Sequence, residues 1–392
     1  MTPQARVQAG IEILDLVIAA ARGGGASADR IVADWFKTRR FAGSKDRRAV
    51  RELVYGAIRA CGDVPQSGRA AMLRLAADDA ALPPLFDGSG HGPQPIAPDE
   101  QPATGGIAPG WLESVLAESG IAGADAQALL GRAPLDVRVN TLKADRGTLD
   151  LPEPGEPLAA LQGLRFASGT GVEQWDAYAR GLIEVQDGGS QIACLAAAAQ
   201  PGETVIDLCA GAGGKTLALA AAMAGRGHLI ACDTDRGRLS RLAPRAERAG
   251  AGLIETRLLN PNHEAEMLDD LAGRADAVLV DAPCSGTGTW RRNPEARWRL
   301  SPGEIARYAA VQARLVDLAA SLVRPGGRVI FVTCSLLDAE GADQAAGFLA
   351  RHPQWRAALP PLPAGTPRGQ GWRLAPGHDG TDGFFIACFT AP

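Results

Sequence analysis

Long hydrophobic runs are missing from this 392-residue sequence, and so are the usual metal-binding spacings of cysteine and histidine. No apolar stretch approaches the roughly 20 residues of a membrane-crossing helix, and residues 1–6 lack the basic and then apolar pattern that opens a secretion signal. The seven cysteines include no C-x-x-C pair, and the five histidines show no H-E-x-x-H spacing. These absences disfavour membrane proteins, secreted disulfide scaffolds and metalloenzymes, and they lead us to expect a cytoplasmic protein.

A strong excess of positive charge is missing as well, because the formal net charge is −4. A nucleic-acid partner would therefore have to use local basic surfaces rather than a cationic field over the whole molecule. Two basic runs could supply such surfaces, and either could equally be an ordinary solvated surface. They are Lys37, Arg39, Arg40, Lys45, Arg47 and Arg48, and Arg291, Arg292, Arg297 and Arg299.

Hydrophobic patterning divides the chain into four parts. Residues 1–81 repeat apolar side chains at helical spacing, whereas residues 82–108 are rich in proline and glycine, which predicts a linker. Residues 109–188 combine short helices with alternating strand-like runs, as in a small α+β domain. From 189 to 392 strand-like and helical runs alternate, which favours a doubly wound, mainly parallel α/β sheet. The strand-like runs of this last part are Thr204–Leu208, His228–Cys232, Leu253–Arg257, Ala275–Val280 and Arg328–Val332.

A glycine-rich loop joins the first of these strands to the next helix. The loop residues are Cys209, Ala210, Gly211, Ala212, Gly213, Gly214 and Lys215. Glycines let the backbone approach a ligand closely, and the helix that follows offers free N–H groups. A Walker A phosphate loop would need glycine in place of Cys209, so that alternative is disfavoured. A Rossmann-like adenosine site instead predicts an acidic residue about 20 residues later, at the end of the second strand, and Asp233 stands there.

Two cysteines follow two later strands at equivalent positions. Cys284 lies in Asp281-Ala282-Pro283-Cys284, and Cys334 lies in Thr333-Cys334-Ser335. Ligands of open α/β sheets bind beyond the carboxyl ends of the strands. If the two strands are neighbours, about 4.8 Å apart, both thiols face one crevice. A single buried cysteine is usually an apolar filler, but this pair, beside an aspartate, indicates chemistry.

Two thiols and a carboxylate would suit methylation of cytosine at carbon 5. That carbon is a poor nucleophile toward a methyl sulfonium until a thiolate adds to carbon 6 of the ring. A group that protonates or hydrogen-bonds ring nitrogen 3 helps the addition. Afterwards the proton on carbon 5 must leave and the thiolate must be eliminated, and a second thiol could aid that release.

Taken together, the glycine-rich loop and the two cysteine motifs resemble the Nop/Sun family of RNA cytosine-5 methyltransferases, of the RsmB type. Ser44-Lys45-Asp46-Arg47 and Leu53-Val54-Tyr55-Gly56 also resemble the NusB-like helical domain of that type. The resemblance implies a Rossmann-like class I methyltransferase domain at 189–392, preceded by a small α+β RNA-binding domain and an all-α NusB-like RNA-binding domain. It implies S-adenosylmethionine as cofactor and 5-methylcytosine in RNA as product, with 16S ribosomal RNA favoured over transfer RNA, in a monomer without metal.

The resemblance also implies a role for each reacting group. Cys334 would be the nucleophile and Cys284 would assist product release. Asp281 would contact the cytosine and the neighbourhood of the cofactor, and Lys215 would lie close to the base. The loop from Cys209 to Lys215, together with Asp233 and Asp281, would hold S-adenosylmethionine. We further expect the N-terminal helices and Arg291, Arg292 and Arg297 to grip RNA phosphates.

The sequence departs from the family pattern at three places. Ala212 replaces the usual proline of the cofactor loop, Asn260 stands where an acidic residue normally lies near adenine, and Glu340 is followed by Gly341 rather than asparagine. None of these changes removes a reacting group.

Two other functions are open to such a sequence. A DNA cytosine-5 methyltransferase would use Cys284 as its nucleophile and would not need Cys334. A non-catalytic RNA-binding factor of ribosome assembly would suit the basic runs, but it would need no set of Lys215, Asp281, Cys284 and Cys334.

Overall fold

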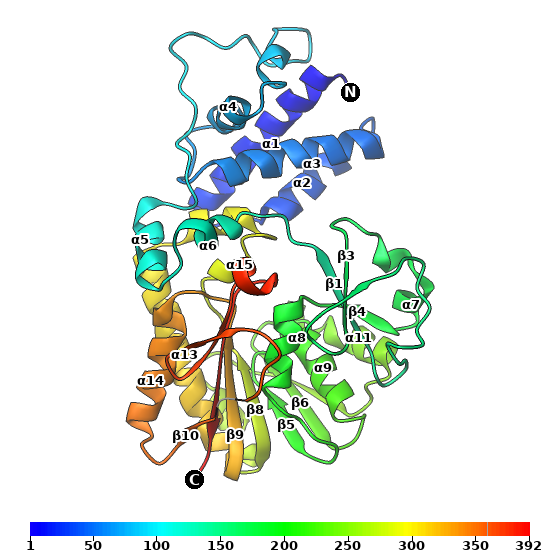
Figure 1. Cartoon of the computed structure of the whole chain (residues 1–392), viewed down its shortest axis with the longest axis vertical. Helices are drawn as coiled ribbons and strands as arrows, with labels where there is room; N and C mark the ends of the chain where they lie inside the picture. The colour runs from blue at the N-terminus through cyan, green and yellow to red at the C-terminus, as the bar shows by residue number, and fades with distance from the viewer. Residues whose placement is uncertain (359) are drawn as a thin grey trace. The chain divides into compact units, whose positions relative to one another are not determined.

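The computed structural model describes residues 1–358 and 360–392, and its internal contacts separate them into two units. Unit 1 consists of residues 1–131 and 289–301, and unit 2 consists of residues 132–288 and 302–392 (Figure 1). The domain boundaries expected after residues 81, 108 and 188 remain predictions. The contacts group residues 109–131 with the helical unit, and they add a segment, 289–301, that the sequence pattern placed in the last domain.

Unit 1 is built from helices, as the sequence pattern predicts for its first 81 residues. Its helices are α1 (Pro3–Gly23), α2 (Ala28–Lys37), α3 (Ser44–Ala60), α4 (Gly68–Asp78), α5 (Gly110–Glu118) and α6 (Gly123–Ala128), with the 3-10 turns η1 (Pro83–Leu85) and η5 (Pro294–Arg299). The first helix begins cleanly because the Thr2 hydroxyl accepts from the Ala5 N–H. Leu14 of α1 and Val54 of α3 are fully buried in one apolar core, which joins the helices of this unit.

The proline-rich segment 82–108 packs on these helices at several points. Arg69 of α4 holds it by donating to the carboxylate of Glu100 and, at 3.1 Å, to the carbonyls of Gln94 and Pro95. Cys61 and Gly105 add an isolated antiparallel bridge. A composition typical of linkers therefore accompanies a segment with defined contacts.

Unit 2 opens with a small antiparallel sheet in the order β2-β3-β1-β4. Its elements are β1 (Leu135–Val139), β2 (Glu156–Pro157), β3 (Gly163–Phe166), the turn η2 (Val172–Gln174), α7 (Asp176–Ala179) and β4 (Ile183–Val185). Val137, Val139 and Ile183 are fully buried in its core, as alternation along a half-buried strand requires. This sheet is the α+β part that the sequence pattern predicts.

The large sheet of unit 2 has the strand order β11-β12-β13-β9-β8-β5-β6-β7, and β10 pairs with β13. Its strands are β5 (Thr204–Asp207), β6 (His228–Asp233), β7 (Ile254–Leu258), β8 (Ala275–Asp281), β9 (Val323–Thr333), β10 (Arg356–Ala357), β11 (Thr366–Arg368), β12 (Gly371–Leu374) and β13 (Phe384–Thr390). Strands β9, β8, β5, β6 and β7 are parallel, as predicted, but β10 to β13 are antiparallel and were not foreseen.

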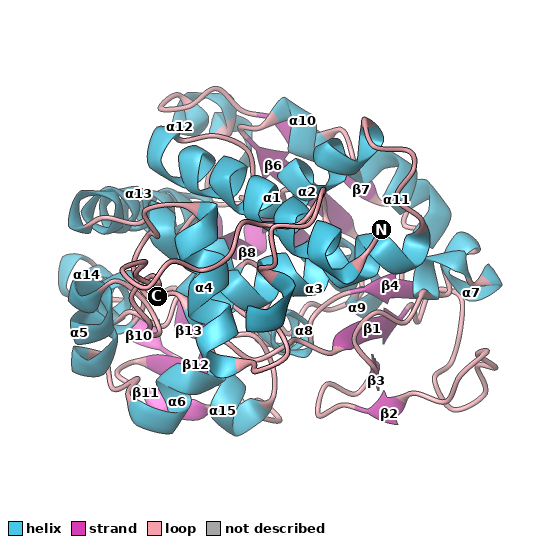
Figure 2. Ribbon diagram, turned by 90° about the horizontal axis from the view of Figure 1, so that it is seen from above, coloured by secondary structure: helices cyan, strands magenta, loops and turns pink. Residues whose placement is uncertain are grey.

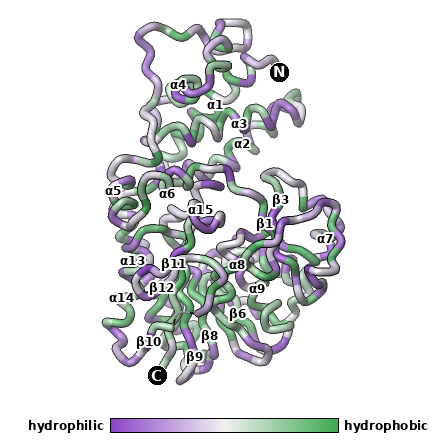
Figure 3. Tube along the Cα trace, in the orientation of Figure 1, coloured by the Kyte–Doolittle hydropathy of each residue, from purple (hydrophilic) through white to green (hydrophobic). Residues whose placement is uncertain are grey.

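Helices cover both faces of this sheet (Figure 2). They are α8 (Gly188–Leu195), α9 (Gly214–Ala222), α10 (Arg236–Leu239), α11 (Leu242–Ala249), α12 (Glu264–Met267), α13 (Pro302–Leu322), α14 (Ala342–Arg351) and α15 (Pro376–Asp379), with the turns η3 (Asp269–Leu271), η4 (Thr287–Thr289) and η6 (Asp338–Glu340). Successive strand residues point into different cores, Val205 into one and Ile206 into the other. The hydrophobic stretches of β8 and β9 are visible in Figure 3. These features give the Rossmann-like α/β fold that we expected.

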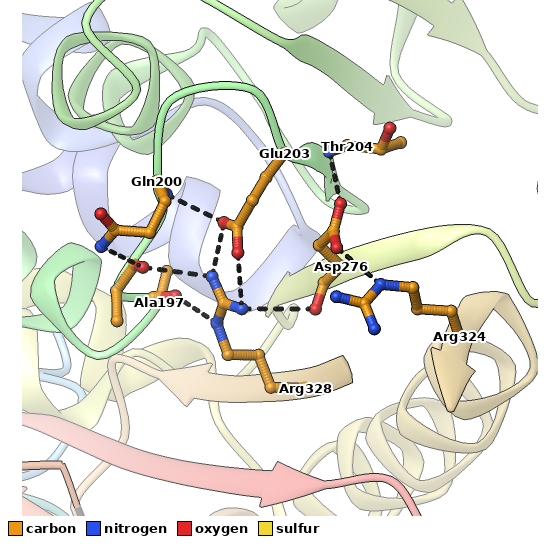
Figure 4. Close-up of polar contacts among 8 residues, drawn as sticks. Ala197, Gln200, Glu203, Thr204, Asp276, Arg324 and Arg328 are labelled. Carbon is orange, nitrogen blue, oxygen red and sulfur yellow. Dashed lines mark hydrogen bonds and ion pairs between the residues drawn. The ribbon is translucent and has the colours of Figure 1, made fainter. Parts of the chain in front are cut away.

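An ion-pair network fixes the amino-terminal edge of the central strands (Figure 4). Arg328 of β9 donates to both carboxylate oxygens of Glu203, at 3.0 and 2.7 Å, and to the carbonyl of Ala197 at 2.6 Å. Asp276 of β8 accepts from the Thr204 N–H of β5 and from Arg324. Because these bonds join the starts of β5, β8 and β9, they help to hold the opposite, carboxyl ends of the same strands level with one another. Within the part of the chain that the structure describes, no helix combines the length and hydropathy of a membrane span.

Candidate active site

A cavity of about 450 Å³ lies at the carboxyl ends of β5, β6, β7, β8 and β9. Five of the residues selected from the sequence line it, namely Cys209, Asp233, Asp281, Cys284 and Cys334. The chain leaves β5 toward β6 on one side and returns to its other side as β8. The cavity therefore lies at the point where the strand order reverses, which is where open α/β sheets bind ligands.

The glycine-rich loop forms the tight turn between β5 and α9. Gly213 has a φ of 84° and directly precedes the helix, and a Cβ there would lie 2.1 Å from the Leu242 side chain. Only glycine fits this position. Ala212 accepts from Arg245 at 2.6 Å through its carbonyl, which anchors the position where the family usually has proline. Residues 210–215 are not among those that line the cavity, although residues 210–214 shape the turn beside it.

Asp233 ties the end of β6 to this loop. One carboxylate oxygen accepts from the Gly211 N–H and the other from the Asp235 N–H, both at 2.7 Å. The side chain is largely buried but still reaches the cavity. Each carboxylate oxygen keeps a second acceptor site, so Asp233 can also receive hydroxyl donors from a ligand.

Lys215 and Asp281 form an ion pair at 2.7 Å, the first from α9 and the second from the end of β8. Burial disfavours the charge of Lys215, but the attraction of Asp281 outweighs it and raises the pKa of the amine above its usual value. Lys215 thus stays protonated and lies 5.3 Å from the ring of Phe384. The pairing of this lysine with a carboxylate at the cavity is a further argument against a phosphate loop.

Cys284 and Cys334 lie in contact, with 3.3 Å between their sulfur atoms. Their strands, β8 and β9, are parallel neighbours, so the expectation that both thiols face one crevice is met. The hydrogen bond with Cys334, together with burial, raises the pKa of Cys284 well above its usual value. Cys284 is consequently held as a thiol at neutral pH.

Of the other five cysteines, only Cys209 lines the cavity within the described residues. Cys61, Cys194, Cys232 and Cys388 are buried, and burial raises the pKa of each to about 11 or 12. Burial also raises the pKa of Cys209. Such thiols are poor nucleophiles. Within residues 1–358 and 360–392 no cluster of three histidine, cysteine or acidic side chains could hold a metal ion.

The sequence reasoning missed an acidic group at the β7 side of the cavity. Asn260 occupies the expected position, but Glu264, from the start of α12, lines the cavity and is 4% exposed. Arg314 of α13 binds both oxygens of this carboxylate, at 2.7 and 3.0 Å. A residue four positions along in a new helix carries no sequence signal that would have identified it.

The expectation that Arg297 grips phosphate is wrong. Arg297 is 0% exposed and donates to the carbonyls of Ile58 and Cys61, at 2.6 and 2.7 Å, and to that of Pro294. Arg291 is buried as well, at 8% exposure. Arg297 therefore belongs to the core of unit 1, because its guanidinium group satisfies backbone carbonyls rather than a solvated ligand.

Comparisons with known proteins agree with this geometry. Residues 194–390, half of the chain, match the family model described as 16S rRNA methyltransferase RsmB/F. A curated relative from Synechocystis sp., named "Probable ribosomal RNA small subunit methyltransferase B", is 37% identical over 270 residues, which are 64% of this chain and 59% of that protein. "Ribosomal RNA small subunit methyltransferase B" of Salmonella arizonae is 34% identical over 266 residues, with 65% and 59% covered.

The match spans about three fifths of the length of these curated relatives. Among solved structures, the crystal structure of PH0851 has a TM-score of 0.76 at 24% identity and covers 99% of each chain, a likeness of fold. The family match extends through the cofactor loop, both cysteine motifs and the last strand. The chain therefore belongs to the RsmB/F family of 16S rRNA methyltransferases.

Proposed function

We propose that this protein transfers a methyl group from S-adenosylmethionine to carbon 5 of a cytosine in 16S ribosomal RNA. The observation that carries the proposal is the contact between two thiols, 3.3 Å apart, in one cavity with Asp281, whose carboxylate is paired with Lys215. A binding protein would gain nothing from this arrangement, whereas covalent activation of a pyrimidine needs a nucleophile, a polar partner for the ring and a group that assists release.

The residues around the cavity fit S-adenosylmethionine. Asp233 offers acceptor sites for ribose hydroxyls, in the position typical of Rossmann-like adenosine sites, and Asp281 and the thiols line the same cavity. Bound there, the cofactor supplies an electrophilic methyl group. We infer that the loop from Cys209 to Lys215, with Asp233 and Asp281, binds it.

Cys334 would begin the reaction as a thiolate that adds to carbon 6 of the cytosine. A bond then forms between sulfur and carbon 6, and the displaced electron pair makes carbon 5 nucleophilic. The Lys215–Asp281 pair would meet the edge of the ring, where the protonated amine of Lys215 can donate a hydrogen bond to nitrogen 3 and stabilise the negative charge that the addition places on the ring. The positive charge of Lys215 also favours negative charge on the nearby Cys334 sulfur.

Release requires the loss of the carbon 5 proton and of the sulfur bond to carbon 6. Cys284 is a thiol in contact with Cys334, so it can pass its proton to the departing sulfur. The Cys284 thiolate formed in this way can take the proton from carbon 5, and its raised pKa makes it a competent base. The double bond between carbons 5 and 6 forms again as both groups leave, which restores the aromatic ring.

The RNA would be held in part outside this cavity. We propose that residues 1–81 form a NusB-like RNA-binding domain and that the small α+β part of unit 2 also contacts RNA. The exposed basic side chains of the first run, including Arg40, Lys45 and Arg48, can contact phosphates. Arg297 is excluded from this role by its burial.

Exchange of each cysteine tests the assignment. Cys284→Ala should accumulate a covalent protein–RNA adduct that survives denaturing electrophoresis, because addition proceeds while release is blocked. Cys334→Ala should form none. The opposite pattern would make Cys284 the nucleophile, as in DNA methyltransferases, and the absence of an adduct in both variants would refute covalent catalysis. Bisulfite sequencing of cellular RNA from a deletion strain would then distinguish 16S ribosomal RNA from transfer RNA.

A further inference from the structure

Glu340 places a buried carboxylate between the two cysteine loops. It ends the 3-10 turn η6, and its side chain is 0% exposed. Within the described residues no lysine, arginine or histidine forms an ion pair with it. Burying a carboxylate without a cation is costly unless several donors satisfy it. The donors of Glu340 therefore identify the segments that its carboxylate holds together.

Neutral donors from the two loops and from α13 satisfy the carboxylate. One oxygen accepts from the Ser285 N–H at 2.8 Å and from the Gln312 amide at 3.2 Å. The other accepts from the hydroxyls of Ser285 and Ser335, the latter at 2.7 Å. Ser285 directly follows Cys284, and Ser335 directly follows Cys334. One carboxylate thus joins the residues next to both thiols.

The two loops depend on Glu340 to different degrees. Both loops have other supports, since the Cys334 carbonyl accepts from the Gly288 N–H at 3.0 Å, the Leu336 N–H donates to the Thr287 hydroxyl at 2.9 Å, and Gln312 donates to the Pro283 carbonyl at 2.9 Å. Glu340 itself, however, accepts two bonds from Ser285, through the backbone N–H and the hydroxyl, and only one from Ser335, through the hydroxyl. Loss of this acceptor should therefore displace Cys284 more than Cys334.

We propose that Glu340 is a positioning residue that keeps the Cys284 thiol in contact with the Cys334 sulfur for the release step. The proposal rests on the proposed function, in which Cys284 serves release and Cys334 serves addition. The Glu340 carboxylate also contributes, after the contact with Cys334 and burial, to the raised pKa of Cys284. Glu340 thereby helps to keep Cys284 in the thiol form that proton transfer to the departing sulfur requires.

Glu340→Gln tests this role, because it preserves size but turns one acceptor oxygen into a donor that faces two serine hydroxyls. Addition and methyl transfer, which use Cys334, should continue, while release slows. We expect kcat to fall by about 100-fold, the scale of a misplacement near 1 Å, with little change in KM. The covalent protein–RNA adduct should accumulate, as in Cys284→Ala. Ser285→Ala loses the hydroxyl bond to Glu340 but keeps the backbone N–H bond. It should therefore lower kcat and accumulate adduct as well, but both effects should be smaller.

Glu203→Gln is the matched control. Glu203 is also a largely buried glutamate of unit 2, but it binds Arg328 at the opposite edge of the sheet (Figure 4). Its exchange should lower stability and leave the ratio of adduct to turnover unchanged. A general loss of folding would reduce adduct and turnover together, so accumulation of adduct in Glu340→Gln alone identifies positioning.

A second measurement reads the spacing of the thiols without RNA. Diamide should join Cys284 and Cys334 in a disulfide, because their sulfur atoms are already in contact, and peptide mass spectrometry gives the rate. We expect Glu340→Gln to slow this reaction about tenfold. If Cys284→Ala accumulates adduct while Glu340→Gln neither accumulates adduct nor slows the disulfide, the positioning role is refuted and the proposed function survives. If Cys284→Ala accumulates no adduct, the proposed function falls, and this inference falls with it.

Discussion

Replacement of Arg297 by methionine tests the structural account of the basic segment 289–301. The Arg297 guanidinium donates to the carbonyls of Ile58 and Cys61, which end α3. A cation at this end of a helix satisfies orphan carbonyls and complements the helix dipole. Methionine fills much of the same volume but removes the guanidinium donor of both carbonyls, and Ile58 then keeps only the Cys61 N–H at 3.4 Å.

The expected loss follows from the two bonds. A hydrogen bond to a charged group contributes about 1.5–3 kcal/mol, so two contribute about 3–6 kcal/mol. Burial lowers the pKa of Arg297 to about 10, which shows that the guanidinium is itself costly to bury and favours the lower end. We therefore expect unit 1 to lose about 3 kcal/mol. Hydrogen exchange read by mass spectrometry should then accelerate about 100-fold in peptides from the last turns of α3.

The salt dependence of RNA binding distinguishes a structural arginine from one that contacts phosphate. Arg297→Met should leave the slope of log Kd against log salt unchanged, because a guanidinium committed to carbonyls neutralises no phosphate. Arg48→Met, an exposed change in α3, should alter stability by less than about 0.5 kcal/mol and reduce the slope by about 1 if Arg48 contacts a phosphate. Unchanged exchange together with a reduced slope for Arg297→Met would show that this reasoning is wrong and that Arg297 contacts RNA.

Two other predictions concern the cavity. Asp233→Asn should weaken binding of S-adenosylhomocysteine at least tenfold by calorimetry, since it removes the charge that orders the Gly211 and Asp235 N–H groups; an unchanged Kd would remove Asp233 from the cofactor site. Iodoacetamide at pH 8 should alkylate Cys334 before Cys284, because the raised pKa of Cys284 leaves it little thiolate. Equal rates in peptide mass spectra would contradict that assignment.

The sequence revealed the parts of the site that depend on local order along the chain. Five parallel strands were recognisable as apolar runs, and the residues after each strand had to meet at one edge of the sheet. The contact between Cys284 and Cys334 followed once β8 and β9 were neighbours. The register of β8 against β9, which brings the two sulfur atoms to 3.3 Å, could not be predicted from the sequence. It depends on contacts between residues far apart in the chain, such as the Arg328–Glu203 pair.

What the sequence concealed depends on long-range pairing. The run Phe384–Thr390 is apolar enough for a strand, but nothing local shows that it pairs antiparallel with β9. Arg297 looked like surface charge because a sequence does not show which carbonyls lack donors. Glu340 looked like a minor departure from a motif, although its carboxylate joins both cysteine loops.

The short distance between the two sulfur atoms prevents both thiols from being ionised at once. Two thiolates 3.3 Å apart would repel by about 5 kcal/mol at an effective dielectric constant of 20, so only one of the pair can be ionised at neutral pH. Lys215 interacts with Cys334, whereas Glu340 disfavours negative charge on Cys284. The proton of Cys284 is therefore retained, which leaves Cys334 as the thiol that the proposed mechanism activates. In the proposed mechanism the two identical side chains take the opposite roles of nucleophile and proton donor, because one neighbour is a cation and the other a carboxylate.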